Sequence, residues 1–152
     1  MKKQVEKILM HFGFNLPVVE DSDFYVEMDA FGFPSVMSIP DKNYKMTKQQ
    51  WEIEQATRKY VAGWNLGVSY ELIAILHEIG HIMEGFTEDE FDTYYEDTDI
   101  LAALYNNGTL TSEQYVDIYN ALPVEAHANS WAANWIRNNK ELADYWDICL
   151  KV

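Results

Sequence analysis

His77, Glu78 and His81 are the residues of this chain whose types and spacing most directly indicate chemistry. They belong to the segment His77-Glu78-Ile79-Gly80-His81, which has the H-E-x-x-H spacing. On an α-helix, residues four apart lie about 40° apart on one face, so both imidazoles can reach one metal ion. Glu78 lies about 100° round from His77, where a carboxylate can take a proton from a metal-activated water and return it to a leaving amine. The segment predicts a zinc-dependent peptidase centre in which Glu78 is the general base.

A single helix from Ser69 to Gly85 is expected to position these side chains. Ser69 is a plausible N-cap, and Gly85 is a plausible stop at the C-terminal end. The face opposite the histidines is apolar. It carries Leu72, Ile75, Ile79, Ile82 and Met83. The pattern predicts a helix with one face buried in the core and the other face holding a polar site.

The composition bounds the class of protein. A chain of 152 residues that is 48% hydrophobic suits one domain, residues 1–152. The sequence has no secretory signal and no long uncharged apolar run, so we expect a cytoplasmic protein. Cys149 is the only cysteine, so a metal within the chain must be held by histidine and carboxylate ligands.

The formal net charge of -14 restricts the partners. Nucleic-acid backbones and anionic membranes would both be repelled, so we expect no direct binding to either. A protein or peptide substrate is compatible with this charge. The sequence does not indicate an oligomeric state.

The remaining patterns predict an α+β fold that is mainly helical, with a small β-meander before the H-E-x-x-H helix. The expected strands are Leu16–Val19, Phe24–Met28 and Val36–Ile39. Capping-box patterns at Thr47/Gln50, Thr87/Glu90 and Thr111/Gln114 indicate three helix starts. Further helices are expected over Val5–Phe12, Val124–Asn138 after Pro123, and Glu141–Leu150.

A catalytic zinc site needs a third protein ligand, and His127 and Glu125 are the candidates downstream. Glu125 shares a helix face with alanines that would let its helix approach the H-E-x-x-H helix closely, whereas His127 points about 200° away. The alternative for Glu125 is a solvated glutamate that stabilises a helix start. Asn129, one turn after Glu125, is expected to hydrogen-bond the second ring nitrogen of a ligand histidine.

A tyrosine could also stabilise the oxyanion of a tetrahedral intermediate. The sequence offers several candidates without choosing among them. They are Tyr70, Tyr94, Tyr95 and Tyr105.

Two segments together resemble a known family. H-E-I-G-H followed by Glu125-x-x-Ala128-Asn129-x-Trp131-Ala132 is similar to the pattern of the ImmA/IrrE family of small gluzincin-type metallopeptidases. The resemblance implies a minimal zincin-like domain with Zn2+ bound by His77, His81 and Glu125, and with Glu78 as general base. Family members cleave helix-turn-helix repressors of mobile elements and stress regulons, which implies an intracellular protein substrate. Trp131 replaces the family's usual phenylalanine.

Two other functions fit the sequence. A zincin-like fold with this charge could act as a non-catalytic binder, an inhibitor or a mimic of DNA. The metal site could also be purely structural, which predicts a closed fourth coordination position.

Overall fold

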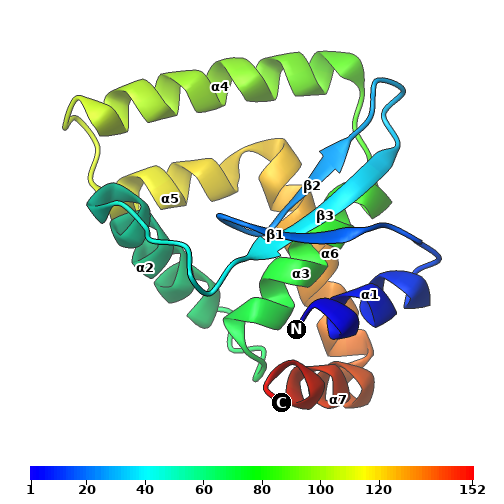
Figure 1. The fold of residues 1–152 in the computed structure, drawn as a ribbon. Helices are drawn as coiled ribbons and strands as arrows, with labels where there is room; N and C mark the ends of the chain where they lie inside the picture. Colours follow the sequence, from blue (N-terminus) through cyan, green and yellow to red (C-terminus); the bar gives the residue numbers. More distant parts are fainter.

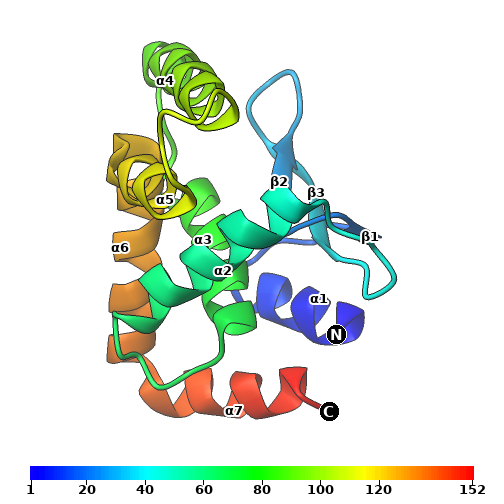
Figure 2. The ribbon, with the colours of Figure 1, turned by 90° about the vertical axis from the view of Figure 1, so that its left-hand side faces the viewer.

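Two helices that pack against each other form the middle of the molecule, α3 (Tyr70–Glu84) and α6 (Pro123–Asn138). The structure, a computed structural model, describes all residues from Met1 to Val152. A small sheet lies on one side of α3, and α6 lies on the other (Figure 1, Figure 2). The fold is α+β and mainly helical, which confirms the predicted class.

The sheet has three strands, β1 (Val18–Asp21), β2 (Tyr25–Met28) and β3 (Pro34–Pro40). Their order is β1-β3-β2; β3 pairs with β2 antiparallel and with β1 parallel. The predicted meander is therefore wrong in its connectivity, because β1 and β2 are not neighbours. The loop between them crosses β3, where the buried Ser38 hydroxyl donates a hydrogen bond to the Asp23 carbonyl at 3.0 Å. β2 is consequently an edge strand.

The other helices surround this centre. They are α1 (Lys2–His11), α2 (Lys48–Ala62), α4 (Glu88–Asn106), α5 (Ser112–Ala121) and α7 (Lys140–Leu150). Figure 1 shows α4 along the top with α5 below it, and α1 and α7 at the bottom. Thr47 and Thr111 form complete capping boxes with Gln50 and Gln114, as predicted. Thr87 caps α4 by accepting a hydrogen bond from the Glu90 backbone N–H.

One cluster of 20 buried residues forms the core. The apolar face of α3 contributes Leu72, Ile75 and Ile79, each of which is fully buried. On the side of α6 that carries Trp131 and Trp135, the tryptophans pack with α1 and α7, and the Trp135 and Trp146 rings stack at 4.9 Å. These tryptophans are packed against the core. None of the helices combines the length and the apolar character needed to cross a membrane.

Candidate metal centre

The N-terminus of α3 is fixed by a residue from α7. Ser69 caps the helix by accepting from the Leu72 backbone N–H, and both its own N–H and its hydroxyl donate to the Asp147 carboxylate. Burial alone would raise the pKa of Asp147. The hydrogen bonds from Ser69 and Lys151 outweigh that effect and hold the pKa below its usual value. α3 is therefore anchored at its start as well as along its apolar face.

α3 and α6 lie unusually close where the H-E-x-G-H segment has its glycine. A Cβ atom at Gly80 would be 2.8 Å from the carbonyl oxygen of Ala128 and 3.1 Å from its Cα. Ala128 and Ala132 are fully buried in this contact. Small residues on both helices therefore permit the close approach predicted from the alanines of α6, and a short carboxylate on α6 can reach the histidines of α3.

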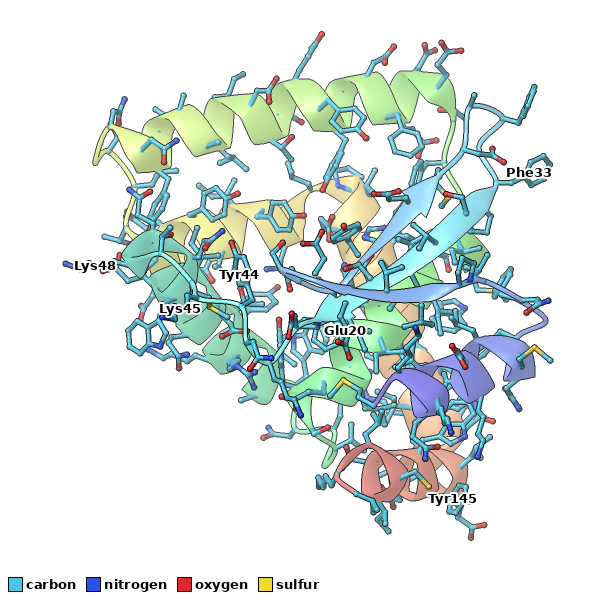
Figure 3. The ribbon with its side chains drawn as sticks, viewed as in Figure 1. Glu20, Phe33, Tyr44, Lys45, Lys48 and Tyr145 are labelled. Carbon is cyan, nitrogen blue, oxygen red and sulfur yellow. The ribbon has the colours of Figure 1, made fainter.

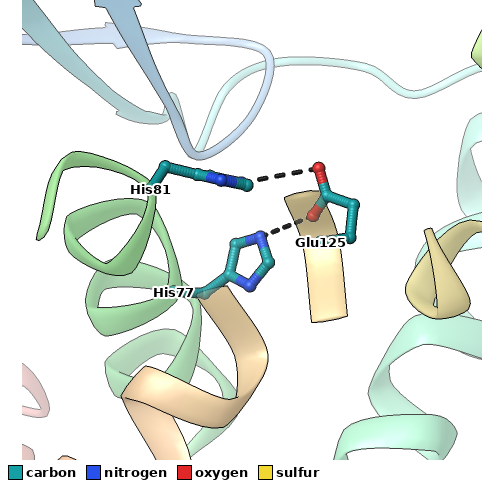
Figure 4. A group of neighbouring side chains, drawn as sticks. All are labelled: His77, His81 and Glu125. Carbon is teal, nitrogen blue, oxygen red and sulfur yellow. Dashed lines mark ion pairs between the residues drawn. The ribbon is translucent and has the colours of Figure 1, made fainter. Parts of the chain in front are cut away.

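The structure brings together the three residues predicted as ligands (Figure 4). The Glu125 carboxylate lies between the imidazoles, with Oε2 2.8 Å from His77 Nε2 and Oε1 3.4 Å from His81 Nε2. One ligand atom from each residue lies within 4.8 Å of the others. Glu125 is only 3% exposed, which excludes a solvated helix-start glutamate. His127, the other candidate, is exposed and lies outside this group.

A chain of hydrogen bonds fixes the tautomer of His77. The Asn120 amide donates to the Val116 carbonyl, and the Asn129 amide donates to Asn120 Oδ1, each at 2.8 Å. Asn129 Oδ1 is therefore an acceptor, and it lies 2.6 Å from His77 Nδ1. Because the chain starts at a backbone carbonyl, Nδ1 must carry the proton. Asn129 thus makes the predicted contact with His77.

This arrangement requires positive charge at the centre. With the proton on Nδ1, a neutral His77 would direct the Nε2 lone pair at an anionic carboxylate. Burial alone would lower the pKa of His77, but the Glu125 carboxylate, helped by Glu78 and Asn129, raises it to about 9. Burial alone would raise the pKa of Glu125, and the two imidazoles instead hold it well below its usual range. Either a proton or a metal cation satisfies the site.

Zinc fits this set of donor atoms. Two imidazole nitrogens and a carboxylate oxygen are ligands that zinc accepts in catalytic sites. Tetrahedral zinc with ligand distances of about 2.0–2.2 Å separates its ligand atoms by about 3.4 Å. The separation between His81 Nε2 and Glu125 Oε1 has that value, and the one from His77 is somewhat shorter. The two separations involve different oxygens of Glu125, so the carboxylate would turn to place one oxygen on the ion.

Glu78 lies beside this group without belonging to it. Its carboxylate has no hydrogen-bond or ion-pair partner within the chain, and it lines two cavities. Burial raises the pKa of Glu78, an effect opposed by His77 and His81 and reinforced by Glu125 and Asp23. A half-buried carboxylate with a raised pKa is a stronger proton acceptor than an exposed one, as a general base requires.

Two tyrosines hold the Glu125 carboxylate in place. The hydroxyls of Tyr94 and Tyr119 donate to Glu125 Oε1 at 2.7 and 3.0 Å, and they lie 2.8 Å from each other. Of the four tyrosines considered from sequence, Tyr94 is the one that reaches this carboxylate. Tyr105 instead donates to Glu52, and Tyr95 is 58% exposed. Tyr70 lines a cavity that His77 and Glu78 also line.

Three residues at the site were not found from sequence: Tyr119, Asn120 and Asp23. Tyr119 lies on an amphipathic helix, and helix periodicity does not say which other helix a residue faces. Asn120 is buried in the structure, but an asparagine near the end of an amphipathic helix does not reveal this in the sequence. Asp23 belongs to a loop and offered none.

Two cavities meet at Glu78. The first, of about 370 Å3, lies between α2, α3, α5 and the β1–β2 loop. The second, of about 590 Å3, lies between the edge strand β2, the end of α3 and α4. Asp23, Tyr119 and Glu125 line both, so an extended ligand could pass Glu78 from one cavity to the other.

Comparison of the chain with family models, with curated proteins and with solved structures finds no match.

Proposed function

We propose that this protein is a zinc-dependent endopeptidase that hydrolyses peptide bonds of an intracellular protein. The observation that carries the proposal is the convergence of His77, His81 and Glu125 beside the unpartnered carboxylate of Glu78. A structural zinc site would have its surroundings closed, whereas here Glu78 and the ligands line open cavities. The cytoplasm is the compartment we infer for it.

Each residue of the site has a separate role in the proposed reaction. A zinc ion held by His77, His81 and Glu125 would supply an activated water and polarise the substrate carbonyl. Glu78 accepts the proton of the attacking water and transfers it to the amine nitrogen as the peptide bond breaks. Asn129 keeps His77 in the ligating tautomer, and Tyr94 and Tyr119 hold the Glu125 carboxylate.

The edge strand β2 supports a peptide as the substrate. It lines the second cavity together with Glu78 and His81, and only one of its edges is paired, with β3. An extended peptide can add to such an edge through main-chain hydrogen bonds. By its resemblance to ImmA/IrrE peptidases, a helix-turn-helix repressor of a mobile element or stress regulon is the substrate we favour.

The test is the Glu78→Gln variant, which keeps the size of the side chain and removes the base. Zinc-loaded wild-type protein should cleave a peptide library, and the variant should bind zinc normally but turn over at least about a hundredfold more slowly. Glu20→Gln, on the exposed part of β1, is the matched control. Equal turnover of Glu78→Gln and wild type would contradict the peptidase proposal. A cellular effect that survives in Glu78→Gln would favour the acidic binder or DNA mimic instead.

A further inference from the structure

The first cavity is lined by both aromatic and acidic side chains. We call it the acidic cavity. It is defined by Asp23, Phe24, Glu54, Trp64, Tyr70 and Glu78. Aromatic side chains are among its lining residues, and four carboxylates lie in its walls, those of Asp23, Glu54, Glu78 and Glu125. No lysine or arginine lines it. Lys48, at the start of α2, is 89% exposed and points away from the molecule (Figure 3).

Two of these carboxylates have no function in the metal centre and little compensation of their charge. Asp23 accepts one hydrogen bond, from the Phe24 backbone N–H at 2.7 Å, and it forms no ion pair. Glu54 has one cationic neighbour, Arg58, at 3.7 Å. That guanidinium is closer to Glu71, at 3.2 Å, and it lies over the Tyr70 ring at 4.3 Å. The cavity therefore presents a net negative charge to whatever enters it.

The titration of the two carboxylates agrees with this geometry. Burial raises the pKa of Asp23, although the side chain remains open to the cavity. Burial likewise raises the pKa of Glu54, an effect opposed by Arg58 and reinforced by the charge of Asp23. Burial thus disfavours the anionic form of both carboxylates, and an incoming cation would offset that effect.

We propose that the acidic cavity binds the lysine or arginine side chain of a peptide substrate, at a residue next to the bond that is cleaved. The proposal rests on the proposed peptidase function, because His77 and Glu78 line the same cavity. A long basic side chain matches both kinds of wall. Its methylene groups pack on aromatic rings such as Tyr70 and Trp64, and its charged end meets Asp23 and Glu54.

The size and the overall charge of the protein agree with this substrate class. The cavity volume of about 370 Å3 lies in the range of ordinary ligand pockets. The net charge of -14 attracts basic proteins and raises the rate at which they encounter the site. The size of the cavity and the charge of the protein both favour a basic segment of a protein chain as the substrate.

The first experiment measures cleavage preference. Zinc-loaded protein is incubated with a peptide library, and the new termini are sequenced. Lysine and arginine should be enriched at least about tenfold over glutamine and methionine at one position beside the cleaved bond. The double variant Asp23→Asn/Glu54→Gln should lose this enrichment, whereas Glu20→Gln, outside the cavity, should keep it. Circular dichroism checks that each variant is folded. Cleavage without any basic preference would overturn the inference and leave the peptidase proposal standing.

The second experiment measures binding in the absence of turnover. Zinc-loaded Glu78→Gln protein is titrated with peptides that differ only in one residue, lysine or norleucine. Tighter binding of the lysine peptide, lost in the Asp23→Asn/Glu54→Gln background, would support the acidic cavity even if no peptide is cleaved. Equal binding of the two peptides, together with no cleavage preference, would reject the proposal that the acidic cavity binds a basic side chain.

Discussion

The backbone of Ala128 lies so close to Gly80 that a Cβ atom at position 80 would be 2.8 Å from the Ala128 carbonyl oxygen. This contact sets the distance between α3 and α6, and therefore the distance between Glu125 and the two histidines. An alanine at position 80 would normally stabilise a helix by about 1 kcal/mol relative to glycine. Here it must separate the two helices.

Gly80→Ala is therefore expected to lower the free energy of unfolding by about 1–3 kcal/mol and to weaken zinc binding. Chemical denaturation and zinc titration measure the two effects. The close atoms of Ala128 belong to its backbone, so adding Ala128→Gly should not restore stability. A Gly80→Ala variant that is as stable as wild type and binds zinc equally well would show that the helices are not in this contact.

Glu125→Ala tests the third ligand, with His127→Ala as its control on the same helix. Wild-type protein should bind about one zinc ion per chain at a site with three protein ligands. Loss of Glu125 removes one ligand and leaves the two imidazoles alone, so bound zinc should fall close to zero after dialysis. His127 is exposed and outside the group, so its loss should change nothing. Mass spectrometry measures the zinc content of each variant. Equal zinc content in Glu125→Ala and His127→Ala would contradict the assignment of Glu125 as a ligand.

Asn129→Ala tests the hydrogen-bond chain that fixes His77. Without its acceptor, His77 can rotate and can place the proton on either ring nitrogen, so zinc affinity should fall by about 10–100-fold. Asn134→Ala, an exposed position on the same helix, is the control. Competition with a chelator gives the affinities. Asn120→Ala should lower zinc affinity by a smaller factor, because Asn129 would still be present but its amide would be free to turn.

Asp147→Asn tests the anchor of α3 and its dependence on pH. The pKa of Asp147 is lowered in the folded protein, because hydrogen bonds from Ser69 and Lys151 outweigh the effect of burial. A lowered pKa means that the carboxylate stabilises the fold above the pKa of about 3.9 expected in the unfolded chain, and that this contribution is lost as pH falls through the folded value. At pH 7 the variant should be less stable by about 1–3 kcal/mol.

The stability difference between Asp147→Asn and wild type should shrink as the pH is lowered from 5 to about 2. Asp144→Asn is the control, because Asp144 lies on the same helix, is half exposed and pairs only with Lys140. Urea unfolding at a series of pH values provides the measurement. A stability difference that stays constant over this pH range would mean that the charge of Asp147 does not stabilise the fold.

The sequence predicted those parts of the fold and the site that depend on a single helix. Periodicity places His77 and His81 on one face of α3, and Glu125 and Asn129 on one face of α6. Thr47 and Thr111 mark helix starts because a cap acts on backbone groups only three residues away. The alanines of α6 indicated that the two helices could approach each other, whereas the part that Gly80 plays in this contact is seen only in the structure.

The sequence did not predict features that depend on how separate elements meet. Strands of four residues do not specify their partner, so β1 was expected beside β2 and instead pairs with β3. Tyr119 reaches Glu125 because α5 and α6 meet at a corner before Pro123, and the angle of that corner is set by packing. Asp23 lies at the site because Ser38 holds the β1–β2 loop across β3.

The separation of Glu125 from the histidines along the chain has a consequence for biosynthesis. α3 leaves the ribosome carrying His77 and His81, and all of α4 and α5 must follow before Glu125 is made. Asp147, which fixes the start of α3, is made later still. A nascent chain thus carries two imidazoles but neither the carboxylate nor the anchor. His77, His81 and Glu125 can converge only after α6 has docked against α3, so a metal ion can be held by all three only once the chain has been made through α6.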